Sequence, residues 1–231
     1  MKKISHLCML LLLLCTTFFV LNVNVTREIV RIQEMGKTTY SFDLYLKDVT
    51  KPTETILQFF EEVASQDKVS IIKVDNGDEV VKAGVFDKET FPYQEFGLTS
   101  LDFSKNEKGV YSNQNLPNNL GTIPIFLKVK LIRLQTFRSY IEDKSYTVNG
   151  RYMITSSKEI DRDTILQKWS DFFQIDKMIL LEPTYRSQVG VLNQALLLSI
   201  IIFILAILLV ILMTVYQPMM EMKRVGVQKL L

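Results

Sequence analysis

The sequence of 231 residues has very few of the side chains that carry catalysis or metal binding. It contains one histidine, His6, and two cysteines, Cys8 and Cys15, and all three lie in the first apolar block. The chain after this block therefore has no Cys/His, Ser/His or histidine–metal arrangement and no disulfide. No Gly-rich phosphate loop precedes a helix. We expect no cofactor, no metal and no enzymatic activity.

The two cysteines fit apolar packing, because free cysteine is commonly buried as a small apolar side chain. A lipoprotein signal at Cys15 is the alternative, although Leu14 stands where such signals prefer a small residue. An excess of charge is also missing. The formal net charge is +2, and without a long basic patch we expect no nucleic-acid partner.

Charge is absent from residues 195–216. As a helix rising about 1.5 Å per residue, this run would be roughly 33 Å long, enough for a hydrocarbon core of roughly 30 Å. Pro218 then ends or bends the helix. The first apolar block, residues 4–23, is also long enough to span. We therefore expect transmembrane helices at 1–24 and 194–217.

The basic residues next to these blocks predict the topology. Lys2 and Lys3 precede the first block, and Lys223, Arg224 and Lys229 follow the second. Because basic residues flank membrane helices on the cytoplasmic side, both termini should be cytoplasmic, with a cytoplasmic tail at 218–231. The segment 25–193 should then be extracellular, in a multi-pass protein of the cell membrane with two spans.

A cleaved signal peptide is the alternative for the first block. The segment Asn22-Val23-Asn24-Val25 is a poor cleavage context, because it offers no Ala-x-Ala-like site. The uncleaved helix is therefore preferred, with a helical extension or stalk at 26–36.

The middle segment predicts an α+β domain. Alternation at 39–46 predicts a strand, Pro52 begins a helix capped by Thr50 or Lys51, and Val69–Val74 reads as a second strand. We infer parallel pairing of these two strands with a right-handed crossover. A third strand is expected at 79–86.

The later elements follow the same rules. We expect a long loop with short strands at 91–120, which would be either a binding segment or a partly mobile one. A long strand or strand pair is expected at 121–137. Val148-Asn149-Gly150 predicts a hairpin turn, and 151–155 a strand. Asp161 should cap a helix, and Lys177–Leu181 should form a strand.

The helical segments of the two halves can be superimposed without a gap. Thr55-Ile56-Leu57-Gln58 falls on Thr164-Ile165-Leu166-Gln167, and Asp67-Lys68 on Asp176-Lys177. Chance similarity of amphipathic helices is one explanation. The other is a duplicated unit, which predicts two βαβ-like units forming one sheet with helices on one face.

The tail carries a resemblance to a known family. It reads Glu221-Met222-Lys223-Arg224-Val225-Gly226-Val227-Gln228-Lys229-Leu230-Leu231. This charged cluster, with a Gly and a basic residue before Leu-Leu, resembles the segment after the second membrane helix of FtsX-like and MacB-type ABC transporter permeases. The matching residues are Glu221, Arg224, Gly226, Val227, Lys229, Leu230 and Leu231. The whole chain is similar to the N-terminal part of the Gram-positive bacteriocin-associated integral membrane proteins of that group.

The resemblance implies a permease-like membrane subunit linked to bacteriocin export or immunity, coupling a cytoplasmic ATPase to an extracellular domain. Implied partners are an ABC ATPase subunit, the lipid membrane, a bacteriocin peptide and a second copy in a dimer. The implied ATPase contacts are Glu221, Lys223, Arg224, Gly226 and Lys229. For Lys223 and Arg224 the alternative is topology signalling and attraction to anionic lipid, and for Gly226 a helix end.

Members of the family also have a third and a fourth membrane helix. The chain could therefore be a truncated permease, one subunit of a split permease or an excised part of one. A different function is open as well. The chain would then be a two-span membrane protein, such as an immunity or sensor protein, that displays an extracellular binding domain without an ATPase.

Overall fold

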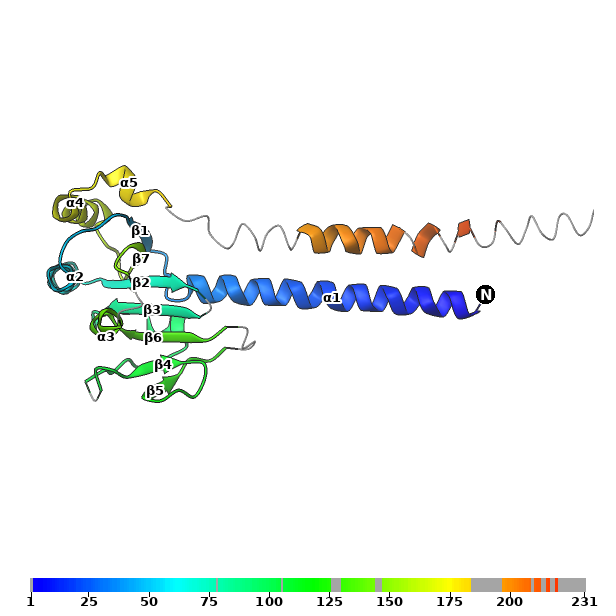
Figure 1. Cartoon of the computed structure of the whole chain (residues 1–231), viewed down its shortest axis with the longest axis horizontal. Helices are drawn as coiled ribbons and strands as arrows, with labels where there is room; N and C mark the ends of the chain where they lie inside the picture. Colours follow the sequence, from blue (N-terminus) through cyan, green and yellow to red (C-terminus); the bar gives the residue numbers. More distant parts are fainter. Residues whose placement is uncertain are drawn as a thin grey trace, which may run out of the picture. The chain divides into compact units, whose positions relative to one another are not determined.

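The computed structural model describes residues 2–77, 79–104, 106–125, 130–143, 147–183, 197–208, 210–212, 215, 216 and 219. The chain divides into two compact units. We call Met1–Arg27 with Ser187–Leu231 the apolar unit, and Glu28–Arg186 the sheet domain. Helix α1, Lys2–Glu34, begins in the apolar unit, and its last residues belong to the sheet domain (Figure 1).

Among the described residues, one helical segment is long and apolar enough to cross a membrane. It is Leu13–Glu34, 22 residues within α1, so the expected helical extension at 26–36 is confirmed up to Glu34. A signal sequence has the same properties, and both interpretations of this segment stay open. A second apolar helix, Leu197–Leu212, is shorter than the roughly 20 residues of a span, with residue 209 outside the described residues. The span at 194–217 stays a prediction.

Within the apolar unit, α1 contacts the helix Leu197–Leu212. Asn22 Nδ2 donates to Ser199 Oγ at 2.7 Å, and the rings of Phe19 and Phe203 stack with centroids 5.1 Å apart. Asn22 follows Phe19 along the chain, whereas its partner Ser199 precedes Phe203, so the two helices are antiparallel.

The sheet domain contains one mixed seven-stranded sheet in the order β1-β7-β2-β3-β6-β4-β5 (Figure 1). Neighbouring strands are antiparallel except β3 with β6 and β4 with β5. This confirms the α+β class. The strands are β1 Phe42–Leu46, β2 Ser70–Asn76, β3 Val80–Val85, β4 Val110–Ser112, β5 Asn119–Thr122, β6 Ile132–Thr136 and β7 Gly150–Thr155.

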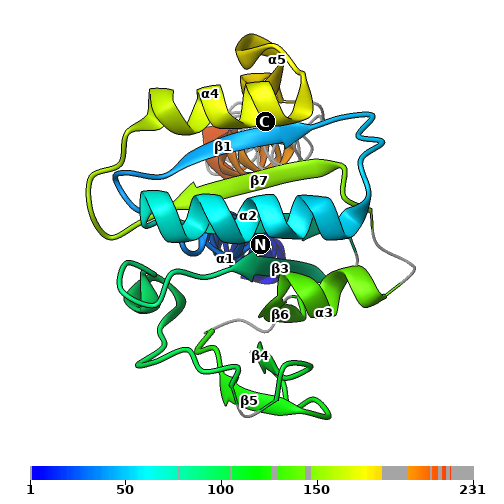
Figure 2. The ribbon, with the colours of Figure 1, turned by 90° about the vertical axis from the view of Figure 1, so that its left-hand side faces the viewer.

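Four helices pack on one face of this sheet. They are α2 Thr53–Asp67, α3 Phe137–Glu142, α4 Arg162–Phe173 and α5 Lys177–Leu181. The buried residues of α2 and α4 recur every three to four positions and join one core with β1, β2 and β7. In Figure 2, α4, α2 and α3 lie in that order across the sheet. The cap of α4 is Asp161, as predicted, whereas α2 is capped by Pro52 rather than Thr50 or Lys51.

The other face is covered by the end of α1 and by the segment that follows β3. Ile32 and Met35 pack with Phe96 of the 3₁₀ helix η1, Tyr93–Phe96, against Met153 of β7. The prediction that helices cover one face therefore holds for α2 to α5, and the end of α1 lies on the opposite face.

The predicted direct pairing of 39–46 with 69–74 is wrong. β7 lies between β1 and β2 and is antiparallel to both, so β1 and β2 run parallel without touching. The first unit is therefore a split strand–helix–strand arrangement, because strand pairing depends on a segment that is remote in sequence.

The second predicted unit is also wrong in its last part. Lys177–Leu181 is a helix, α5, whose N-cap Asp176 accepts a hydrogen bond from Met178 N. The turn at Asn149-Gly150 makes no hairpin either, because α3 precedes it and β7 pairs with β1 and β2. In 121–137 the strand is confined to β6 and the end of β5, with 126–129 outside the described residues.

Candidate functional site

The residues implied as ATPase contacts, Glu221, Lys223, Arg224, Gly226 and Lys229, lie outside the described residues. The sheet domain offers two other candidate sites. One is the junction at which α1 ends on the sheet. The other is a cavity at the carboxyl ends of β3 and β6.

At the junction, the fully buried Lys82 of β3 binds the end of α1. Its Nζ donates to the carbonyl of Gln33 at 3.0 Å and to the carbonyl of Met35. These carbonyls lack partners within the helix because Gln33 lies in its last turn and Met35 directly after it, where the helix dipole also favours a cation. Burial, helped by the nearby positive charge of Arg151, lowers the pKa of Lys82 to about 7.

Arg151 of β7 makes a second set of bonds to the same helix end. Its guanidinium holds Asp43 of β1 through two hydrogen bonds of 3.0 Å each, and it donates to Glu34 Oε1 at 3.1 Å. Lys37 lies 2.8 Å from Glu34 and 3.4 Å from Asp43. Two carboxylates and two cations therefore join the last residue of α1 to both β1 and β7.

The turn after α1 is tied down as well. Gly36 has φ +91°, and an added Cβ would meet the ring of Phe96, so this position requires glycine. Its carbonyl accepts from Thr155 Oγ1 of β7 at 2.7 Å, and Thr38 Oγ1 donates to the carbonyl of Ser156 at 2.7 Å. We call the side chains Lys82, Arg151 and Thr155 the α1 clamp.

A second buried lysine lies on the opposite face of the sheet. Lys73 Nζ of β2 donates to the carbonyl of Asn149 at 2.7 Å and lies 5.6 and 5.5 Å from the ring centroids of Tyr140 and Tyr152. Burial lowers the pKa of Lys73 to about 8, although the charge of Asp75 opposes the shift. This lysine fixes the turn before β7 to the centre of the sheet.

Sequence reasoning missed the clamp. Its signal is a single lysine within an apolar strand, as in Val80-Val81-Lys82-Ala83, because a charge placed there must be buried and must find partners. The clamp attaches α1 to two different strands by side chains that are mostly buried. A displacement of the end of α1 must therefore move β3 and β7 or break several hydrogen bonds.

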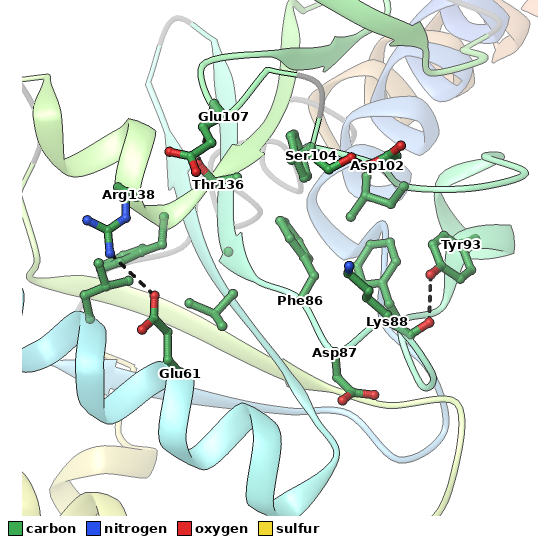
Figure 3. Close-up of a pocket in the computed structure, with 17 residues that line it drawn as sticks. Glu61, Phe86, Asp87, Lys88, Tyr93, Asp102, Ser104, Glu107, Thr136 and Arg138 are labelled. Atoms are coloured by element: carbon green, nitrogen blue, oxygen red, sulfur yellow. Dashed lines mark hydrogen bonds and ion pairs between the residues drawn. The ribbon is translucent and has the colours of Figure 1, made fainter.

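The cavity has a volume of about 330 Å³ and is shown in Figure 3. Gly84–Phe86 forms one wall at the end of β3, and Thr136–Arg138 lies beside it where β6 enters α3. Leu57 and Glu61 of α2 form another side, and the segment around Leu101–Ser104 closes the last. Part of the predicted loop 91–120 therefore does line a cavity.

No group of three or more His, Cys, Asp or Glu side chains could hold a metal ion within the part of the chain that the structure describes. None of the protein-family models matches the sequence, and none of the curated proteins is significantly similar to it. The chemistry of the two sites therefore has to be inferred from their own residues.

Proposed function

We propose that this chain is a permease-like membrane subunit, or a part of one, in a MacB-type ABC system linked to bacteriocin export or immunity. It would couple a cytoplasmic ATPase to an outer domain, with Glu221, Lys223, Arg224, Gly226 and Lys229 contacting the ATPase. The tail supports this proposal by its resemblance to those permeases.

The structural observation that supports the coupling role is the α1 clamp. α1 is one continuous helix from Lys2 to Glu34, and its last turn is bound by Lys82 and Arg151. A rod that transmits motion must neither bend along its length nor slip at its end. A membrane anchor needs only attachment, so buried bonds to two strands favour coupling over simple anchoring.

The first experiment tests the ATPase contact. The tagged full chain is purified from membranes of cells that express it with its ABC ATPase. Glu221→Ala, Arg224→Ala and Gly226→Leu should each reduce the recovered ATPase several-fold, because they remove the implied contacts. The control, Lys158→Ala, changes an exposed residue of the sheet domain and should leave recovery unchanged. Equal recovery from all four variants would contradict the proposal.

The second experiment tests the coupling. Thr155→Val removes the hydrogen bond to the carbonyl of Gly36. Arg151→Lys removes the bidentate pair of hydrogen bonds to Asp43. The double variant should recover the ATPase normally and still lose protection or export. Full activity in a double variant with weakened attachment of α1 would show that the clamp is structural.

The cavity favours a second candidate, a two-span protein that displays a binding domain without an ATPase. A lined cavity is what a binding domain needs and what a pure coupling rod does not. Protection that persists in cells lacking every candidate ATPase, with a chain that purifies alone, would favour this function over the first.

A further inference from the structure

The cavity lies at a place where the topology opens the sheet. β3 and β6 are parallel, with Gly84 opposite Thr136, and both strands end beside the cavity. The chain then leaves β3 toward η1 and leaves β6 into α3, on the other face of the sheet. Crevices outside the carboxyl ends of adjacent parallel strands with diverging connections are recurrent ligand sites.

A second cavity of about 350 Å³ adjoins the first. Both are lined by Glu61, Val85, Phe86, Asp87 and Lys88, so they lie side by side, and we call the two cavities together the groove. The second cavity extends it along the last turns of α2, past Ala64 and Lys68. Each cavity is near the lower limit of about 300 Å³ for ligand sites. An extended chain that places one or two side chains in each cavity fits this groove better than a compact molecule.

One wall of the groove is aromatic and partly open. The half-buried rings of Phe86 and Phe103 stack with centroids 5.6 Å apart, and Phe91 meets Phe86 edge-on at 5.0 Å. A Cβ at Gly84 would lie 2.8 Å from the Phe86 ring, so the absence of a side chain there lets the ring lie across the end of β3. Exposed ring faces of this kind accept apolar side chains and cations.

The charges around the first cavity are unequal. Four carboxylates line it, those of Glu61, Asp87, Asp102 and Glu107. Only two cations in its lining oppose them, those of Lys88 and Arg138. Arg138 lies 3.8 Å from Glu61, which offsets one carboxylate, while the carboxylate of Glu107 is exposed at the rim (Figure 3). The remaining excess of negative charge favours a positively charged ligand.

We propose that this groove binds an extended peptide in which a lysine or arginine side chain adjoins an aromatic or aliphatic one. The apolar side chain lies against Phe86 and Phe103, and the cation faces Glu107 and the neighbouring carboxylates. This inference concerns the sheet domain and goes beyond the proposed coupling to an ATPase. Each can fail without the other, because peptide binding requires neither the tail nor a nucleotide.

The test uses the full chain in detergent micelles and three fluorescein-labelled hexapeptides. The sequences are Gly-Lys-Phe-Leu-Lys-Gly, its acidic counterpart Gly-Glu-Phe-Leu-Glu-Gly, and Gly-Lys-Ser-Ser-Lys-Gly without apolar side chains. Fluorescence anisotropy should show binding of the first peptide, with the other two bound about tenfold more weakly or not at all.

The variants locate the binding. Phe103→Ala should weaken the first peptide about tenfold because an aromatic contact is lost, and Phe103→Leu should weaken it less. Glu107→Gln should weaken it up to about fivefold, as expected of one exposed ion pair, whereas Glu159→Gln, an exposed carboxylate outside the groove, should have no effect. The fluorescence of Trp169 checks that each variant is folded.

Four outcomes would overturn the proposal. They are equal binding of the basic and acidic peptides, tighter binding of the acidic one, binding that the folded Phe103 and Glu107 variants leave unchanged, and absence of any binding at millimolar peptide.

Discussion

Phe60 and Trp169 stack in the centre of the sheet domain, with ring centroids 5.0 Å apart and planes inclined by 21°. They occupy equivalent positions of α2 and α4, because the superposition that places Ile56 on Ile165 also places Phe60 on Trp169. Both side chains are fully buried. The two helices therefore contact each other through residues that the superposition of their sequences makes equivalent.

Replacing Phe60 should remove much of the core between α2 and α4. Phe60→Ala should lower the free energy of unfolding of the sheet domain by about 3 to 5 kcal/mol, since it leaves a large cavity. Urea unfolding of the full chain in micelles, followed by the fluorescence of Trp169, the only tryptophan in the sequence, measures this. Met178→Ala, at a residue 74% exposed, should change it by less than about 0.5 kcal/mol. If both variants lost less than about 0.5 kcal/mol of the free energy of unfolding, the contact of Phe60 with α4 would contribute little to stability.

Gly36 should not tolerate a side chain. Gly36→Ala forces a Cβ against the ring of Phe96 in a backbone conformation with φ +91°, so it should destabilise the sheet domain by more than about 1 kcal/mol. Gly77→Ala is the matched control, because nothing lies within 4 Å of a Cβ at that position. The same urea titration compares them, and equal stability of the two variants would argue against the described end of α1.

The two buried lysines should make stability rise with pH. Their pKa values in the fold are about 7 for Lys82 and about 8 for Lys73, below the ordinary 10.5. Between the folded and ordinary values the unfolded chain binds more protons, so the free energy of unfolding increases with pH. Each lysine contributes at most about 1.4 kcal/mol per pH unit. Urea titrations from pH 7 to pH 9.5 should show the rise.

The lysine variants separate this effect from the rest of the protein. Lys82→Met should reduce the slope from pH 7 upward, and Lys73→Met should reduce it above pH 8. Lys158→Met, at an exposed lysine, should leave the slope as it is. A stability that falls over this range, or a slope that survives both substitutions, would contradict the assigned burial of these groups.

Replacing Arg151, even by lysine, should lower the free energy of unfolding. Arg151→Lys keeps the charge but cannot hold both oxygens of Asp43, whereas Arg151→Met leaves Asp43 and Glu34 without this cation. We expect a loss of about 1 kcal/mol for the first and about 2 to 3 kcal/mol for the second, since the pair is mostly buried. Urea unfolding ranks the variants, and a methionine variant as stable as the parent would argue against the pair.

The antiparallel contact in the apolar unit can be tested by cross-linking. In a chain with Cys8→Ser and Cys15→Ser, Asn22→Cys together with Ser199→Cys should form a disulfide, because the parent side chains are hydrogen-bonded at 2.7 Å. Leu21→Cys with Ser199→Cys should not, since Leu21 is 61% exposed and the neighbouring Asn22 is the residue bonded to Ser199. Oxidation in membranes followed by a gel shift reads the result, and equal cross-linking of both pairs would contradict the contact.

The sequence predicted local structure better than pairing. Alternation at 39–46 predicted the strand found at 42–46, the turn signal before 151–155 preceded the strand predicted there, and Asp161 marked the start of α4, because each signal depends on neighbours in the chain. The strand predicted at Lys177–Leu181 is a helix, and the sequence could not decide because a short run with four apolar residues fits a strand and a helix equally. Its assignment depends on the capping bond from Met178 to Asp176, which the apolar pattern alone does not reveal.

The candidate sites divide in the same way. Lys82 and Arg151 carry a signal in sequence, as charges within strands, but their partners come from α1 and β1, remote in sequence. A binding segment was one of the two predictions for the loop at 91–120, yet the cavity also needs the ends of β3 and β6, and the parallel pairing of those strands depends on tertiary structure. The implied ATPase contacts stay a prediction.

The position of β7 has a consequence for how the domain is made. β1 is synthesised more than a hundred residues before Gly150, yet its partner in the sheet is β7. A nascent chain that ends before β7 holds an unpaired strand edge, whatever compartment it enters. The sheet can therefore be completed only after β7 has been synthesised. A nonsense mutation anywhere upstream of Thr155 should yield a product that proteases degrade, rather than a smaller folded domain.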